Sequence, residues 1–293
     1  MKSPSSPLER PVGLNRRQCL AAGLVACTSG VTGATESPPV LRFGLTPVFL
    51  DDRVSLLRQW AEHLEHVLGM TVQFAQFSSY SQMVDAVRAS QVHFAWICGY
   101  PYVRHRHEMR LVTVPVWRGR PLYQSYLIAD KASSVRTVDD LQGRTFAYSD
   151  PLSNSGFLYP QHLLRSRGHD PARHFRKGFF TYSHRHVVDA VSQGLAEAGA
   201  VDGYVWETLA ELSPAVTSRT RVMLRSPDFG FPPIVAPLST PDSLVRRFAT
   251  TLHGMAGSEP GRKLLSGLRL DGFMHAQPPL FDSIADMARA LQA

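Results

Sequence analysis

The chain is poor in cysteine. It has three among 293 residues, and two of them, Cys19 and Cys27, lie close to the amino terminus. A fold built on disulfide bonds needs several cysteine pairs along the chain, and metal sites built on cysteine need at least two at short spacing. Cys98 alone remains farther along the sequence. The sequence therefore excludes a disulfide-built fold.

Charged residues are also scarce, at 19% of the chain. Of the formal net charge of +7, the first 26 residues supply +3 through four basic residues and one acidic residue: Lys2, Arg10, Arg16, Arg17 and Glu9. The other basic residues are scattered, without a basic stripe interleaved with aromatic residues, so no nucleic-acid partner is predicted. The mild positive balance that remains suits a small anionic ligand.

The amino terminus has the pattern of an export signal. Arg16 and Arg17 precede the apolar run Cys19–Ala26, which is far too short to span a membrane but has the length of a signal-peptide core. The paired arginines resemble a twin-arginine signal, and the Sec route stays open. We therefore expect a periplasmic or cell-envelope protein.

Two processing sites fit this leader. The segment Leu24–Cys27 resembles a lipobox, in which Cys27 becomes the lipidated first residue of the mature protein. The alternative is ordinary cleavage within Val31–Thr35, which leaves no anchor. Contact with the membrane is expected only through such a lipid anchor.

Beyond the leader, helix and strand patterns alternate. With 44% hydrophobic residues, 21 glycines and 21 prolines, the composition is that of a turn-rich α/β protein. Strand patterns cover 40–45, 71–77, 92–97, 111–117, 122–128, 144–148, 178–182 and 198–201. Helix patterns follow Asp51 or Asp52 and Ser78 or Ser79, lie near 139–143, 157–167 and 187–192, and close the chain at 242–254, 260–266 and 281–291.

The strand 122–128 is long enough to cross between two lobes, and the proline-rich segment 221–237 is the expected return crossing. These crossings predict two discontinuous α/β lobes, one containing 40–122 plus 225–293 and the other 123–224. Residues 1–35 are assigned to the export signal.

Short polar side chains cluster between a predicted strand and a predicted helix, in Ser153, Asn154 and Ser155. A helix start offers unpaired backbone N–H groups and the positive end of the helix dipole, so it attracts anions. One such residue is enough to cap a helix, which leaves the alternative of a cap and a turn without a ligand. Three in a row favour an anion site.

This loop, Ser153-Asn154-Ser155-Gly156 followed by Pro160, resembles the hydroxyl-rich loop of the phosphonate-binding proteins of ABC importers. The resemblance extends along most of the chain. It includes the segments Phe43–Pro47, Phe94–Tyr102, Phe179–His184 and Gly199–Asp202.

The resemblance implies a periplasmic-binding-protein fold of the second type, with a hinge and with a phosphonate, phosphite or phosphate held in the cleft between the lobes. It implies that Ser153, Asn154, Ser155, Gly156 and His184 bind this oxyanion. A tyrosine of the first lobe, Tyr102 or Tyr100, is expected to complete the site, and Asp202 to accept a hydrogen bond from a P–OH or an ammonium group. Each of these has a plainer alternative: a core position for the tyrosines, and a helix cap for His184 and Asp202. The implied partner is an ABC permease.

Two departures from the family pattern bear on the ligand. Asn154 replaces the loop threonine, and Ser226–Pro233 has proline where aminoalkylphosphonate binders carry an acid. Phe49 also stands where a polar aromatic residue fits. A small ligand or one with an apolar tail is therefore favoured.

Rival functions find less support. His105 with His107, and His184 with His186, are spaced two apart and do not share a helix face, so no metal site and no cofactor are predicted. Ser153, His184 and Asp202 occur in an order compatible with a hydrolase triad, but no G-x-S-x-G turn precedes a helix, so an enzyme is not expected. The alternative with the same fold is a monomeric binder of a sulfonate, a vitamin precursor or another metabolite, or a partner of a membrane sensor.

Overall fold

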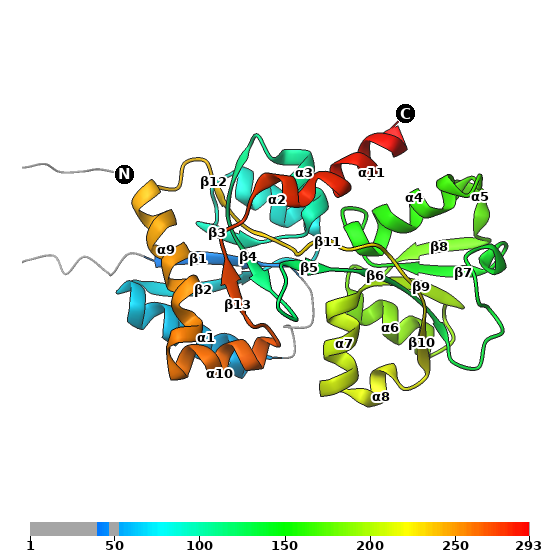
Figure 1. Ribbon diagram of the computed structural model, residues 1–293, viewed down its shortest axis with the longest axis horizontal. Coiled ribbons are helices and arrows are strands. Elements are labelled where there is room, and N and C mark those ends of the chain that lie inside the picture. Colours follow the sequence, from blue (N-terminus) through cyan, green and yellow to red (C-terminus); the bar gives the residue numbers. More distant parts are fainter. Residues whose placement is uncertain (1–39, 47–52, 293) are drawn as a thin grey trace, which may run out of the picture. The chain divides into compact units, whose positions relative to one another are not determined.

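The computed structural model describes residues 40–46 and 53–292 (Figure 1). These residues belong to one compact unit, in which two sheets are each covered by helices. The predicted α/β class with two lobes is confirmed. The predictions made at Arg16, Arg17, Cys27, Phe49 and the helix-capping pair Asp51 and Asp52 lie outside the described residues.

The first lobe is built around a sheet with six strands among the described residues. Their order is β13 (Gly272–Met274), β4 (Met109–Val116), β12 (Ile234–Pro237), β3 (Phe94–Trp96), β1 (Val40–Leu45) and β2 (Thr71–Gln76). β1 runs parallel to β2 and β3, because a helix returns the chain between successive strands. β12 pairs with β3 and β4 in the antiparallel sense.

The helices of the first lobe come from both ends of the chain. They are α1 (Val54–Leu68), α2 (Tyr80–Arg88), α3 (Gly99–His105), α9 (Asp242–Gly254), α10 (Glu259–Leu268) and α11 (Asp282–Gln292), with the short turns η3 (Met255–Gly257) and η4 (Pro278–Phe281). α1 packs against α9 and α10, while α11 packs against α3 and also against α4 of the second lobe. The carboxyl-terminal helix therefore contacts both lobes.

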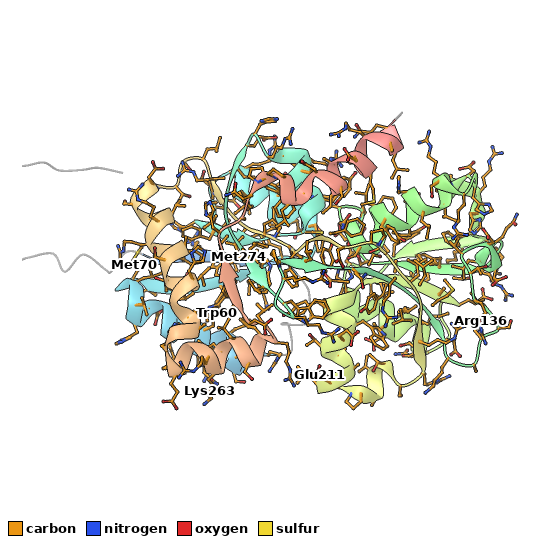
Figure 2. All side chains as sticks on the ribbon, in the orientation of Figure 1. Trp60, Met70, Arg136, Glu211, Lys263 and Met274 are labelled. Atoms are coloured by element: carbon orange, nitrogen blue, oxygen red, sulfur yellow. The ribbon has the colours of Figure 1, made fainter. Side chains whose placement is uncertain are left out.

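The apolar stripe of α1 fixes how the helix lies on the sheet. Trp60 (Figure 2) is fully buried against Phe43 and Phe74, and Leu64 lies beside it on the same face. Val67 follows Leu64 by three residues, but its side chain is 50% exposed. Leu68 occupies the inward position instead, because it lies four residues after Leu64 and so completes the turn on the buried side.

The second lobe has a sheet of five described strands. Their order is β10 (Thr220–Arg225), β6 (Ser125–Asp130), β9 (Ala198–Asp202), β7 (Thr145–Tyr148) and β8 (Lys177–Phe180). This sheet is mixed: β7 is parallel to β8 and β9, whereas β6 is antiparallel to β9 and β10. The reason is that β6 and β10 continue the two crossing segments, which run in opposite directions.

Short helices cover this second sheet. They are η1 (Asp139–Leu141), a π-helical turn η2 (Asn154–Leu158), α4 (Tyr159–Ser166), α5 (Pro171–His174), α6 (His184–Ser192), α7 (Gly203–Leu212) and α8 (Pro214–Thr217). α6 packs across β6, β7, β9 and β10, with Val187, Val188 and Val191 buried as their spacing predicted. In the part of the chain that is described, no helix combines the length and the apolar character needed to cross a membrane.

Two short strands, β5 (Leu122–Tyr123) and β11 (Phe229–Gly230), pair with each other between the two sheets (Figure 1). The strand predicted over 122–128 is interrupted at Gln124, whose carbonyl accepts from Gly203 N and whose side chain donates to Ser226 O. The return crossing is shorter than predicted, because β10 and β12 lie within their own sheets. The residue limits of the lobes stay a prediction.

Candidate functional site

The polar loop singled out in the sequence lies between β7 and α4. Ser153 is the cap of the turn that follows, and its hydroxyl accepts a hydrogen bond from Gly156 N at 2.9 Å. Leu158 N then donates to Ser153 O, which closes a turn wider than that of an α-helix. The helix therefore begins two residues later than predicted, at Tyr159. Ser153 alone supplies the side-chain cap of the turn Asn154–Leu158, so its neighbours are not needed as caps.

Unpartnered polar atoms gather in this loop. Among the described residues, five buried side-chain N or O atoms have no hydrogen-bond partner, and three of them belong to Ser149, Asn154 and Ser155. A buried polar atom left unpaired costs about 1–3 kcal/mol, so such atoms are normally paired. Three such atoms lie within seven residues, so this loop has an unusual concentration of polar atoms that no group of the protein satisfies.

The loop holds these atoms together through a close approach of Gly156 to Ser149. A Cβ atom on Gly156 would lie 1.8 Å from Ser149 Oγ and 2.7 Å from Ser149 Cβ, far inside van der Waals contact. Only glycine fits here without moving the loop. Gly156, which the family resemblance included in the site, therefore shapes the site through its lack of a side chain.

Asn154 joins the loop to residues far away in the chain. Its backbone N–H donates to Cys98 Sγ, with N and S 3.3 Å apart, and its Nδ2 donates to the hydroxyl of Tyr123 at 2.9 Å. Its Oδ1 is the atom without a partner. Exchange of the two amide positions would let Oδ1 accept from the Tyr123 hydroxyl and turn the amide donor to the vacant side. Asn154 can thus offer an anion a donor.

His184 begins α6, as predicted, and its side chain is fully buried. Burial lowers the pKa of His184 to about 3, so the ring is neutral near pH 7. Its Nδ1 accepts from the backbone N–H of Asp202 at 3.1 Å, which places the ring proton on Nε2. Nε2 lies 3.3 Å from the hydroxyl of Tyr80. His184 is therefore a fixed, uncharged donor.

Asp202 caps α7, which is the plainer of its two predicted roles. Its Oδ1 accepts from Tyr204 N at 2.8 Å and from Val205 N at 3.3 Å. Burial raises the pKa of Asp202 to about 7, although both N–H groups act to lower it. Its charge also raises the pKa of Tyr80 and of Tyr123, so the carboxyl group acts on the same cluster as the loop.

Stability without ligand should report the ionisation of Asp202. Its pKa of about 7 lies above the ordinary 3.8, so its favourable contribution is complete below about pH 4 and is lost as the pH rises through 7. Asp202→Asn keeps Oδ1 for the cap. It should reduce the fall in the free energy of unfolding with rising pH by up to about 1.4 kcal/mol per pH unit. Denaturant unfolding at pH 5, 6, 7 and 8 measures the difference.

His184 sets the opposite trend in both proteins. Its pKa of about 3 lies below the ordinary 6.5, so its contribution is complete above pH 6.5 and is lost as the pH falls toward 3. This trend cancels when the Asp202→Asn profile is subtracted from the parent profile. If the free energy of unfolding depends on pH in the same way in both proteins, the pKa of Asp202 is not raised by burial.

Two tyrosines that the sequence did not single out contact the site. Tyr80 starts α2 in the first lobe, and Tyr123 lies on the crossing strand β5. Both are buried, and burial holds the pKa of each well above its ordinary value, so both hydroxyls stay protonated. One signal was available for Tyr80: it begins a helix after β2, as the polar loop does after β7, and ligands bind at such carboxyl ends of parallel strands.

Tyr100 and Tyr102, the predicted first-lobe tyrosines, are buried in α3. The ring of Tyr102 packs edge-on against Phe281, and the guanidinium of Arg104 lies over the ring of Tyr100. These contacts are those expected of residues packed in the core, which is the alternative given for the two tyrosines. The ligand role of the two tyrosines stays a prediction.

The cluster holds no cation of its own: its donors are serine and tyrosine hydroxyls, an amide and a neutral histidine. Within 40–46 and 53–292, no group of three or more histidines, cysteines or acids is placed to hold a metal ion. Cys98 keeps its proton, because burial raises its pKa to about 11. The arrangement is suited to binding an oxyanion through neutral hydrogen-bond donors.

Known proteins that resemble this chain are also described as binding proteins for oxyanions. A family described as ABC transporter, phosphonate, periplasmic substrate-binding protein matches residues 43–280. The chain is 24% identical over 207 residues to the probable ABC transporter phosphite binding protein PhnD1 of Prochlorococcus marinus strain MIT 9301, covering 66% of this chain and 68% of that protein.

Two solved structures are similar. The binding protein component of an ABC phosphonate transporter from Pseudomonas aeruginosa has a TM-score of 0.80 at 21% identity, covering 86% of each chain. PhnD1 of P. marinus in complex with methylphosphonate has a TM-score of 0.78 at 20% identity, covering 87% of this chain and 99% of that chain. At such identities the structures show the fold, while the family match spans most of the sequence. The chain belongs to the family of periplasmic substrate-binding proteins of phosphonate ABC transporters.

Proposed function

We propose that this protein captures a phosphonate, phosphite or phosphate oxyanion and delivers it to an ABC permease. The observation that carries the proposal is the set of buried, unpartnered polar atoms of Ser149, Asn154 and Ser155 in a loop at a helix start. A tetrahedral oxyanion presents several oxygens and requires convergent donors. It would supply the partners that this loop lacks.

The proposed seat consists of the loop Ser153–Gly156 with Ser149, His184, Tyr80 and Tyr123. Tyr80 is added to the tyrosine expected at Tyr100 or Tyr102, since the Tyr80 hydroxyl lies 3.3 Å from His184 Nε2. Neutral donors avoid the cost of burying unpaired positive charge. The protonation state of Asp202 complements that of the ligand. An ionised Asp202 accepts a hydrogen bond from a P–OH, and a protonated Asp202 donates one to a fully ionised phosphoryl group.

The departures in the sequence point to a small ligand. Pro232, which stands where aminoalkylphosphonate binders carry an acid, uses its carbonyl to accept from Trp96 Nε1 at 2.9 Å. A proline supplies no carboxylate for a ligand ammonium group. Phosphite, phosphate and methylphosphonate are therefore proposed ahead of aminoethylphosphonate.

A binding role rather than catalysis is proposed from the histidine contacts. A hydrolytic triad places the histidine between a serine hydroxyl and a carboxylate. Here Nδ1 of His184 accepts from a backbone N–H and Nε2 faces Tyr80. We further propose that the protein is a monomer exported by a twin-arginine-like or Sec signal. The mature chain is proposed to begin at Cys27, with a lipid anchor, or within Val31–Thr35.

Calorimetry on the mature protein tests the ligand. We expect methylphosphonate, phosphite or phosphate to bind, with aminoethylphosphonate at least about tenfold weaker, a difference of about 1.4 kcal/mol. Methanesulfonate is the matched control, because it has the same shape but no P–OH to share with Asp202. Binding of the sulfonate, with none of the phosphorus oxyanions bound, would contradict the proposal and favour the alternative ligand class.

A further inference from the structure

Asp150 lies between the end of β7 and the polar loop, and its carboxyl group makes contacts in both lobes. Its carboxyl group is buried, with the residue 2% exposed. Its Oδ1 accepts from Leu152 N at 2.7 Å within its own loop, and its Oδ2 accepts from Tyr80 N at 3.0 Å. Tyr80 lies 70 residues earlier, at the start of α2 in the first lobe.

The N–H of Tyr80 needs a partner from outside its helix. The first N–H groups of a helix have no intrahelical acceptor. The cap residue Ser79 uses its hydroxyl for Gln82 N, three residues on, and does not serve Tyr80. A carboxylate at this end also faces the positive end of the helix dipole. The second lobe thus completes the amino terminus of a first-lobe helix.

The side chain of Tyr80 is held from the same lobe. Its hydroxyl lies 3.3 Å from His184 Nε2, so the second lobe holds Tyr80 at its backbone through Asp150 and at its hydroxyl through His184. A cavity of about 550 Å³ abuts this contact, lined from both lobes by Ser78, Ser79, Ser81, Asp150, Pro151, Leu152 and Tyr182. The hydrogen bond from Tyr80 N to Asp150 therefore lies beside a cavity between the two lobes.

We propose that Asp150 is a positioning residue that fastens the two lobes across this edge and fixes Tyr80 against the oxyanion seat. The inference rests on the proposed function for the role of the seat, but the bond itself does not require a ligand. Because both carboxylate oxygens accept an N–H, an amide cannot replace the carboxylate: its NH₂ group would face one of the two donors. Asp150→Asn therefore removes one bond and preserves the size of the side chain.

Binding kinetics give the first test. Loss of this charge-assisted bond between the lobes should speed dissociation of methylphosphonate, phosphite or phosphate by about tenfold and leave the association rate within about threefold. Asp140→Asn is the matched control. The Oδ2 atom of Asp140 also accepts two backbone N–H groups, from Arg136 and Thr137, but within a single lobe, so its kinetics should match the parent. Equal dissociation rates for Asp150→Asn and the parent would overturn the inference.

A double-variant cycle separates positioning from general support. If Asp150 acts through Tyr80, the tenfold penalty of Asp150→Asn should shrink to less than about threefold in a Tyr80→Phe background, since the hydroxyl to be positioned is gone. A penalty of the same size in both backgrounds would show that Asp150 supports the loop without positioning Tyr80, and would refute the proposal.

Amide exchange decides the inference even if no phosphorus oxyanion binds. In protein labelled with ¹⁵N-tyrosine, the Tyr80 signal is assigned by its absence in Tyr80→Phe. Without ligand, the Tyr80 amide should exchange at least about tenfold faster in Asp150→Ala than in the parent, because Asp150→Ala removes its acceptor altogether. Identical exchange would show that the bond between the lobes is not formed. Failure of the parent to bind any of the three anions would instead count against the proposed function.

Discussion

Ser155→Ala and His184→Ala are each expected to weaken the binding of methylphosphonate or phosphite by at least about tenfold. Each change removes one hydrogen bond to a charged ligand, which contributes about 1.5–3 kcal/mol, equivalent to about one to two orders of magnitude in the dissociation constant. Ser155 Oγ has no hydrogen-bond partner within the protein, and the Nε2 proton of His184 faces the Tyr80 hydroxyl, a contact that the ligand would share. Isothermal calorimetry on the confirmed ligand measures the effect.

Neighbouring residues of the same type provide the controls. Ser166→Ala removes an exposed serine at the end of α4, and His186→Ala removes an exposed histidine two residues after His184. Both should bind like the parent. Thermal melting of all four variants confirms that they are folded. If Ser155→Ala and His184→Ala bind as tightly as these controls, the seat lies elsewhere.

The largest expected effect of a single change is that of Gly156→Ala. The new Cβ would meet Ser149 Oγ at 1.8 Å, so the loop must move and the donors lose their alignment. We expect binding to weaken by more than about a hundredfold, since several charge-assisted bonds are disturbed together. Gly254→Ala, where nothing lies within 4 Å of the added atom, is the matched control and should be neutral.

A second substitution tests the stated cause. Ser149→Gly in the Gly156→Ala background removes both atoms that clash most closely, leaving Ser153 Oγ at 3.1 Å as the nearest remaining contact. Because of this clash, Gly156→Ala should also lower the thermal stability, and the second substitution should restore most of that loss. Affinity should stay reduced, because Ser149 Oγ is one of the proposed donors. A double variant as unstable as Gly156→Ala alone would place the strain at another contact.

The amino-acid sequence by itself determined the alternation of strands and helices, the crossing between two lobes and the position of the polar loop. These features depend on local patterns: apolar residues repeat at helix or strand spacing, and Ser153 is a helix-capping residue type at a strand-to-helix junction. His184 and Asp202 were also found, through the resemblance of their segments to a family. The sequence left open whether each hydroxyl residue caps the helix or stays available.

Only the tertiary structure decided those roles. Ser153 takes the cap, because the π-helical turn places its hydroxyl at Gly156 N, while the hydroxyls of Ser149 and Ser155 are buried without a partner. The contacts of Tyr80 with Asp150 and with His184 join residues 70 and 104 apart. No local pattern specifies such pairs, since they form only when two separately patterned lobes bring the ends of their parallel strands together around the same point.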